Sequence, residues 1–198
     1  ERQYVDRLPP VQAQKPGAVW NCKIGDSTED WAAALDLGIQ LWVDGLDIQF
    51  DYSAIRPAGT PLRTKGGMAS GPEPFRHALD FIRAKILSRQ GAHLRPIDCH
   101  DIMCAIGGAA VSGGVRRTAM IALCDLYDQD VLGCKDVGTI KGNEQRWNAA
   151  VSAVWDRELD GGEVSEFLEK MHASGNGEPG IFSRRAAQNT RPYRRAKA

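Results

Sequence analysis

Apolar residues recur at helical spacing in three stretches of the first half of the chain. The first stretch follows the polar start signal Asp26-Ser27-Thr28 and stops before Gly45, which predicts an amphipathic helix between them. Further helices are predicted over residues 74–89 and 96–110, the latter beginning with a proline that suits a first helical turn. The apolar positions that define the first two helices are Trp31, Leu35, Ile39 and Trp42, then Phe75, Leu79, Ile82 and Ile86.

Shorter apolar runs predict strands. Residues 118–124 form a continuous apolar run that is typical of a buried, parallel strand. The run at residues 48–52 allows another strand, and residues 150–155 alternate before a further helix. That last helix has Val164, Phe167, Leu168 and Met171 on one side. Because strands and helices alternate along the chain, the pattern favours the α/β fold class.

Two segments lack such a period. Residues 46–72 contain repeated prolines and glycines, which preclude a long regular element, and a loop of this length in a compact domain is usually functional. Residues 184–198 carry basic side chains but no acidic residue and no apolar period. We therefore predict a basic, flexible tail over residues 184–198.

The composition is that of an ordinary globular protein. Apolar residues make up 42% and charged residues 25% of the 198 residues, enough for one domain or two small ones. The 25 basic residues balance the 25 acidic ones, so no net charge draws the chain to nucleic acid or to a membrane. No apolar run is long enough for a membrane helix, and the five cysteines lack a CxxC pair, which fits reduced thiols in the cytoplasm. The start at Glu1 and the basic end indicate a piece of a longer protein.

The candidate chemistry lies in two glycine-rich loops. In Gly113 to Thr118, glycines let backbone N–H groups approach a ligand, and two arginines offer bidentate contacts to phosphate. A helix-to-strand turn with exposed arginines explains the same residues equally well, since neither a Walker A motif nor GxGxxG is present. The segment from Lys65 to Pro72 carries a weaker form of the same signal. The spacing alone leaves both interpretations open.

A zinc site is not favoured. Cys99, His100 and Cys104 have suitable side chains, but on a helix positions 99 and 104 diverge by about 140 degrees. No Ser-His-Asp or Cys-His arrangement can be argued from the sequence. We therefore assign no catalytic residue and no metal ligand.

Two long motifs resemble the adenosylcobalamin-dependent, class II ribonucleotide reductases. They are FDYSAIRPAGTPLRTKGGMASGPEPF (residues 50–75) and CHDIMCAIGGAAVSGGVRRTAMIAL (residues 99–123). Shorter stretches follow the family's order: ERQYVDRLP, IGDSTEDWAAAL, SAVW and GEPGIFSRRAAQ. The resemblance implies that residues 1–183 form the central, incomplete part of the family's ten-stranded α/β barrel. It also implies a role in the reduction of ribonucleotides to deoxyribonucleotides for DNA synthesis.

The resemblance assigns the loops to two nucleotides. Residues 55–67 correspond to a loop on the side of the effector, and residues 113–118 to the loop that links effector and substrate. The implied effector or specificity residues are Arg56, Arg63, Lys65, Gly113, Gly114, Val115, Arg116 and Arg117. The implied substrate-binding residues are Ser70, Gly71, Gly113 and Gly114.

The departures from the family concern catalysis. The Asn-Pro-Cys motif of the family's radical cysteine does not occur in these residues, and none of the five cysteines aligns with the family's reducing pair. Ala150 and Val151 stand where the family has paired asparagines. We therefore expect no turnover by this chain alone, and we expect binding of adenosylcobalamin to need other parts of the enzyme.

The implied partners are a ribonucleotide substrate, a deoxynucleoside triphosphate effector and a thioredoxin-like reductant, with no nucleic acid and no membrane. The alternative is a stand-alone, non-catalytic nucleotide-binding or regulatory module. A nucleic-acid contact through the basic tail ranks last, because the net charge is zero.

Overall fold

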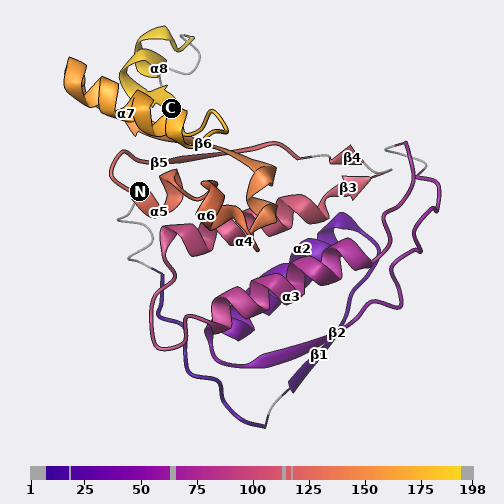
Figure 1. Ribbon diagram of the computed structural model, residues 1–198. Helices are drawn as coiled ribbons and strands as arrows, with labels where there is room; N and C mark the ends of the chain where they lie inside the picture. Colours follow the sequence, from indigo (N-terminus) through magenta and orange to yellow (C-terminus); the bar gives the residue numbers. More distant parts are fainter. Residues whose placement is uncertain (1–7, 18, 63–65, 113–114, 117, 193–198) are drawn as a thin grey trace. The chain divides into compact units, whose positions relative to one another are not determined.

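The computed structural model describes residues 8–17, 19–62, 66–112, 115–116 and 118–192 (Figure 1). For residues 111–112 and 115–116 this description is limited to the backbone. The chain divides into two compact units, residues 2–119 and residues 120–198. The length allowed two small domains, but the sequence pattern did not predict a boundary at residue 119. None of the described helices combines the length and the apolar character that a membrane crossing requires.

The first unit begins with a β-α-β arrangement. Its elements are β1 (Val19–Lys23), α2 (Thr28–Val43) and β2 (Asp47–Asp51). The two strands pair in parallel, from Val19 opposite Asp47 to Lys23 opposite Asp51, so α2 is the crossover between them. Ser27 and Asp30 cap α2 reciprocally: the Asp30 amide donates to Ser27 Oγ over 3.0 Å, and the Ser27 amide donates to Asp30 Oδ2 over 3.1 Å. The predicted helix between residue 28 and Gly45 is confirmed.

Two antiparallel helices complete the core of this unit. They are α3 (Glu73–Leu87) and α4 (Pro96–Ala109), followed by the short strands β3 (Val111–Ser112) and β4 (Val115–Arg116). Figure 1 shows that α3 and α4 run in opposite directions, and Lys85 near the end of α3 pairs with Asp101 in the first half of α4 over 2.8 Å. The core includes Trp42, Leu79, Ile82 and Ile86. Both helices confirm the predictions to within two residues.

The second unit is a three-stranded parallel sheet in the order β5-β6-β7. Its elements are β5 (Met120–Asp125), α5 (Gln129–Leu132), α6 (Val137–Ile140), the 3-10 helix η1 (Glu144–Asn148), β6 (Ala149–Trp155), α7 (Gly161–Ala173), β7 (Gly180–Ser183) and α8 (Arg184–Thr190). The central strand β6 is almost wholly buried. The prediction that the apolar run at residues 118–124 is buried is wrong in part, because β5 is paired on one side in the described residues and its Ile121 is 56% exposed.

The basic end of the chain also differs from expectation. Residues 184–190 form α8, where a flexible tail was predicted; residues 193–198 lie outside the described part. Arg184 Nε lies 2.5 Å from Asp156 Oδ1, and Arg185 Nη1 lies 2.5 Å from Glu158 Oε1. The arginines therefore pair with acids that precede α7, which a reading of residues 184–198 alone could not reveal.

Candidate functional site

The carboxyl edge of the β1–β2 pair carries the first predicted loop. Both strands end there, and Ile24 N donates to Asp51 O over 2.9 Å. Asp26 accepts from Arg56 twice: the backbone amide donates to Oδ1 over 3.0 Å and Nε to Oδ2 over 2.6 Å. Asp26 thus ties the base of the loop to the strand edge, the place where open α/β sheets bind ligands. Arg56, a predicted effector residue, keeps further N–H groups on a side chain that is 40% exposed.

The loop after Arg56 folds back on itself. Backbone hydrogen bonds run from Gly59 N to Ala69 O (3.0 Å), from Ala69 N to Thr60 O (2.8 Å) and from Leu62 N to Gly67 O (2.9 Å). The described parts of this segment, up to Leu62 and from residue 66, therefore pair with each other. Two predicted effector residues, Arg63 and Lys65, lie outside the described residues.

Ser70 and Gly71, the predicted substrate residues, lie directly before α3. Ser70 is half-buried, and its hydroxyl donates over a long 3.4 Å to the Gly71 carbonyl. Gly71 is buried and has a φ of +74°. A Cβ at this position would lie 2.9 Å from the Ala58 backbone nitrogen. The segment before α3 thus packs closely on the base of the loop.

Aromatic side chains support this end of the unit. The ring of Trp31 in α2 stacks on that of Phe75 in α3, with centroids 4.6 Å apart. The guanidinium of Arg76 lies over the ring of Tyr52, 4.5 Å from its centroid. Burial, reinforced by the Asp80 carboxylate, raises the pKa of the Tyr52 phenol to about 12. The first turns of α2 and α3 therefore meet beside the end of β2.

This pKa predicts a loss of stability at high pH. Because the folded chain holds the Tyr52 pKa above its ordinary value of 10.0, folding favours the neutral phenol. The contribution of Tyr52 to stability is fully present below pH 10 and is lost as the pH rises from 10 to about 12. Urea unfolding at a series of pH values checks this against Tyr52→Phe. The difference in free energy of unfolding between the unmodified chain and Tyr52→Phe must change between pH 10 and about pH 12. A difference that stays constant over this range would contradict the raised pKa of Tyr52.

The second predicted loop, residues 113–118, includes strand β4, which pairs with β3. Val111 pairs with Arg116 and Ser112 with Val115, in antiparallel register. Gly113, Gly114 and Arg117 lie outside the described residues, and the description of Val115 and Arg116 is limited to their backbone. After the loop, Thr118 Oγ1 donates to the Gly107 carbonyl in the last turn of α4, over 2.9 Å.

The bases of both loops lie at the same end of the α3–α4 pair. Because the two helices run antiparallel, the end of α4, where β3 begins, lies beside the beginning of α3, where Ser70 and Gly71 lie (Figure 1). The structure therefore places the base of the 113–118 loop at the same end of the helix pair as the segment before α3. The sequence motifs identified both loops but could not show this common position.

Helix α4 carries two cysteines, the half-buried Cys99 and the buried Cys104. On α4, Cys104 Sγ lies 3.6 Å from His100 Nε2, and both residues are buried. Burial raises the pKa of the Cys99 thiol. Within the described part of the chain, no three His, Cys, Asp or Glu residues are grouped so that they could hold a metal ion.

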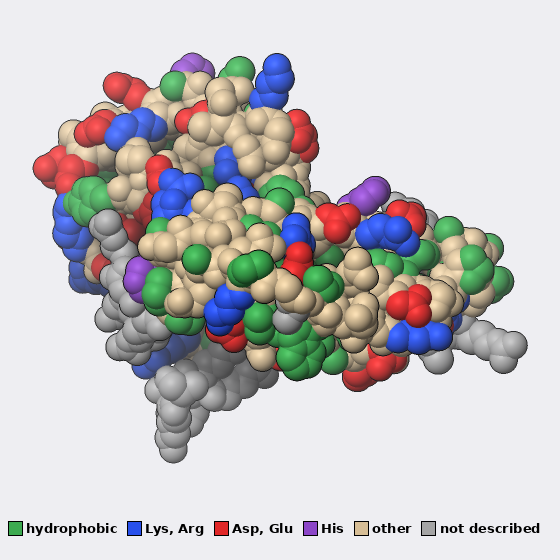
Figure 2. Space-filling view, turned by 90° about the horizontal axis from the view of Figure 1, so that it is seen from below, with side chains coloured by type: hydrophobic (Ala, Val, Ile, Leu, Met, Phe, Trp, Pro, Cys, Tyr) green, Lys and Arg blue, Asp and Glu red, His purple; other side chains and the backbone are tan. Residues whose placement is uncertain are grey.

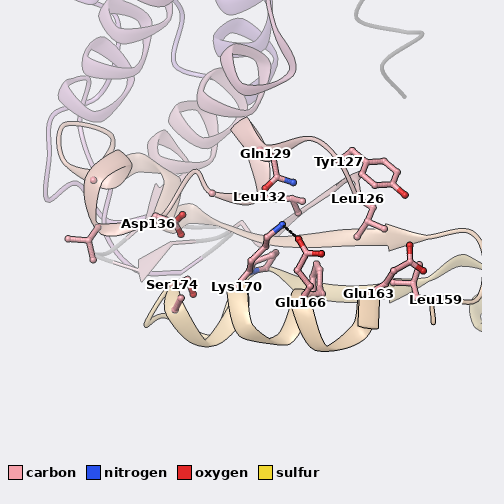
Figure 3. A pocket seen from close by; sticks show the side chains of 16 residues that line it. Leu126, Tyr127, Gln129, Leu132, Asp136, Leu159, Glu163, Glu166, Lys170 and Ser174 are labelled. Atoms are coloured by element: carbon pink, nitrogen blue, oxygen red, sulfur yellow. Dashed lines mark ion pairs between the residues drawn. The ribbon is translucent and has the colours of Figure 1, made fainter. Parts of the chain in front are cut away.

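Sequence analysis missed a pocket in the second unit. It has a volume of about 590 Å³ and lies between α7 and the segment that contains α5 and α6 (Figure 3). Its charged wall contains Asp136, Glu163, Glu166 and Lys170; Lys170 Nζ lies 2.9 Å from Glu166 Oε1. Hydrogen bonds from Arg157 hold the pKa of Glu163 at about 2, so this carboxylate is ionised at neutral pH. A wall with more acidic than basic groups repels phosphate, so we do not assign nucleotides to this pocket.

Comparison with solved structures defines the class of protein. The fold matches a crystal structure of a B12-dependent, class II ribonucleotide reductase with a TM-score of 0.72 and 26% sequence identity. The match covers 92% of this chain and 25% of that one. The predicted α/β class is confirmed, and the chain has the fold of part of such a reductase.

Curated sequences define the family. Over 80% of its length the chain is 31% identical to an adenosylcobalamin-dependent ribonucleoside-triphosphate reductase of Euglena gracilis, and over 84% it is 31% identical to that of Lactobacillus leichmannii. A probable enzyme of this kind from Dictyostelium discoideum is 32% identical over 80% of the chain. The chain spans 20–23% of these relatives, and no family model matches it. It is homologous to a segment of the adenosylcobalamin-dependent ribonucleotide reductases.

Proposed function

We propose that this chain is the nucleotide-binding part of a ribonucleotide reductase, with residues 1–183 contributing to its barrel. The loops 55–67 and 113–118 bind a deoxynucleoside triphosphate effector, and Ser70 and Gly71 contact the ribonucleotide substrate together with Gly113 and Gly114. The observation that carries this proposal is the common position of the loop bases at one end of the α3–α4 pair. The homology to reductases supports the same assignment.

The chemistry of the loops suits this role. Arginine guanidiniums bind phosphate in bidentate fashion, and glycines let backbone amides approach the same oxygens. The effector loop is tied to the strand edge by Asp26 and Arg56, while the substrate segment packs on Ala58. An effector bound to the loop 55–67 can therefore influence the position of Ser70 and Gly71, which contact the substrate.

Catalysis requires residues beyond those seen here. In the proposed reaction a thiyl radical abstracts a hydrogen from the ribose, and a thiol pair supplies the electrons that remove the 2′ hydroxyl as water. A thioredoxin-like reductant then restores the pair, and adenosylcobalamin supplies the radical chemistry. Three of the five cysteines are poorly suited to serve as the thiol pair: Cys104 and Cys134 are buried, and burial raises the pKa of the Cys124 thiol to about 12. We expect this chain alone to bind nucleotides without turnover.

The two alternatives have less support. The curated relatives are named as reductases, which disfavours a separate regulatory module. Acidic and basic side chains are interspersed on the face shown in Figure 2, and the net charge is zero, which disfavours nucleic acid as the ligand.

Isothermal titration with deoxynucleoside triphosphates, and separately with ribonucleotides, tests the proposal. The double substitution Arg116→Ala and Arg117→Ala is expected to weaken binding about tenfold or more, because hydrogen bonds to a charged phosphate contribute about 1.5–3 kcal/mol each. The matched control is Arg184→Ala with Arg185→Ala, another adjacent arginine pair whose acidic partners are Asp156 and Glu158. Equal losses in both double variants, or no binding by the folded chain, would count against the proposal.

A further inference from the structure

The pocket between α7 and the segment with α5 and α6 is lined by residues of the second unit alone. Its volume of about 590 Å³ lies within the range of sites that hold small organic molecules. Phe167, buried in α7, belongs to its wall, and the ring of Phe167 packs edge-on against that of Trp155, with centroids 5.6 Å apart. The pocket therefore offers an apolar surface that packing holds in place. Further apolar side chains of the wall are Leu126, Leu132, Leu159 and Pro179.

The carboxylates of this pocket differ in how far a cation already neutralises them. Glu163 accepts hydrogen bonds from two guanidinium nitrogens of Arg157, one of them over 2.8 Å, so its charge is compensated. Glu166 pairs with Lys170 over 2.9 Å, but both side chains are more than half exposed, and such pairs are weak. Asp136 precedes α6 without a capping hydrogen bond from its side chain, and it has no ion pair within the described part of the chain. Asp136 and Glu166 therefore remain available to a cationic ligand.

These two carboxylates lie at different positions along the pocket. Figure 3 shows Asp136 beside Ser174, where α7 ends, and Glu166 farther back along the same helix. Ser174 and Glu166 are eight residues apart, which corresponds to about 12 Å along a helix axis. Phe167 and Ala173 contribute apolar wall to this stretch of α7. Two negative groups separated by apolar surface match a linear molecule whose positive charges are joined by a hydrocarbon chain.

We propose that this pocket is a binding site for a linear aliphatic polyamine, with one ammonium group at Asp136, another at Glu166, and the hydrocarbon chain on Phe167. Binding replaces Lys170 as the partner of Glu166, at a small cost because that pair is exposed. An inorganic cation of equal charge has no hydrocarbon chain and gains nothing from the apolar wall. The inference goes beyond the proposed nucleotide site, whose loops belong to the first unit, and does not depend on it.

Isothermal titration of the whole chain with three dications of equal charge tests this site: diaminooctane, diaminopropane and Mg²⁺. Diaminooctane is expected to bind most tightly, because it alone is long enough to reach both carboxylates. Asp136→Asn is expected to weaken its binding about fivefold, the upper range for an exposed pair of charges. Ala173→Leu fills the pocket and is expected to abolish binding. The matched control is Glu169→Gln, which removes an exposed charge of α7 that does not line the pocket. This control is expected to bind as the unmodified chain does.

A folded chain that does not bind diaminooctane, or binds it no more tightly than Mg²⁺, overturns the site. Equal losses in Asp136→Asn and Glu169→Gln indicate general attraction to acidic surface and overturn it as well. If Ala173→Leu does not fold, as judged by circular dichroism, Lys170→Met tests the pocket with the opposite sign. This substitution removes the cation that competes for Glu166, so diaminooctane is expected to bind about twofold more tightly. Unchanged or weaker binding by Lys170→Met overturns the role of Glu166.

Discussion

Replacement of Lys135 by Met is expected to lower the free energy of unfolding of the second unit by about 3 kcal/mol. Lys135 Nζ donates to Glu178 Oε2 over 2.7 Å and also to the Ala149 carbonyl, and its side chain is 5% exposed. Methionine fills the space of the aliphatic part but provides no cation. Glu178, whose side chain is 26% exposed, would then keep its bond from Val151 N and lose its counter-charge.

The matched control is Lys170→Met, in the same unit. Lys170 also pairs with a glutamate, Glu166, over 2.9 Å, but the two side chains are 55% and 68% exposed. Exposed pairs of this kind contribute a few tenths of a kcal/mol, so we expect a change below about 0.5 kcal/mol. The measurement is urea unfolding monitored through the hydrogen exchange of the β6 amides. These amides report on the unit that contains both lysines. Equal effects of the two substitutions would contradict the importance of burial.

The contrast between these two pairs marks a limit of sequence analysis. Lys170 and Glu166 are four residues apart on a helix, so their contact can be predicted from spacing. Lys135 and Glu178 are 43 residues apart, and the fold alone brings them together. A lysine in a polar segment is ordinarily exposed. Its burial could not be deduced without knowledge of the packing.

Local signals predicted much of the secondary structure. The cap at Ser27, Gly45 with its φ of +73°, and the proline at the start of α4 act within a few residues, so the helix boundaries were predictable. The predictions were wrong where an element depends on partners that are distant in the sequence. Strand β1 was missed, because its pairing with β2 is non-local, and α8 was missed, because its arginines pair with acids about 28 residues earlier.

In the candidate site, too, local features could be predicted from the sequence and contacts between distant residues could not. Glycines and arginines identified the two loops, since these residue types suit close approach to phosphate. The role of Asp26 in holding Arg56 was missed, because the two residues are 30 positions apart and meet only where β1 and β2 pair. The common position of the loop bases depends on the antiparallel packing of α3 and α4, which no local pattern specifies.

Gly71→Ala is expected to destabilise the first unit by about 2 kcal/mol and to weaken nucleotide binding. The φ of +74° at Gly71 disfavours any residue with a Cβ, at a cost of about 1–2 kcal/mol. The added Cβ would also lie 2.9 Å from Ala58 N, too close for an ordinary contact with backbone. Either the loop base or the start of α3 must move, and both belong to the proposed nucleotide site.

Gly91→Ala separates the two causes. Gly91 lies between α3 and α4, has a φ of +77°, and offers open space to a Cβ. Its replacement therefore carries the backbone cost of about 1 kcal/mol without a steric contact and without displacement of the loop. Thermal unfolding and nucleotide titration of the two variants should differ: Gly71→Ala loses more stability and also affinity, while Gly91→Ala keeps its affinity. If both bind nucleotide as the unmodified chain does, the close packing of Gly71 on Ala58 serves the fold alone and does not position the substrate segment.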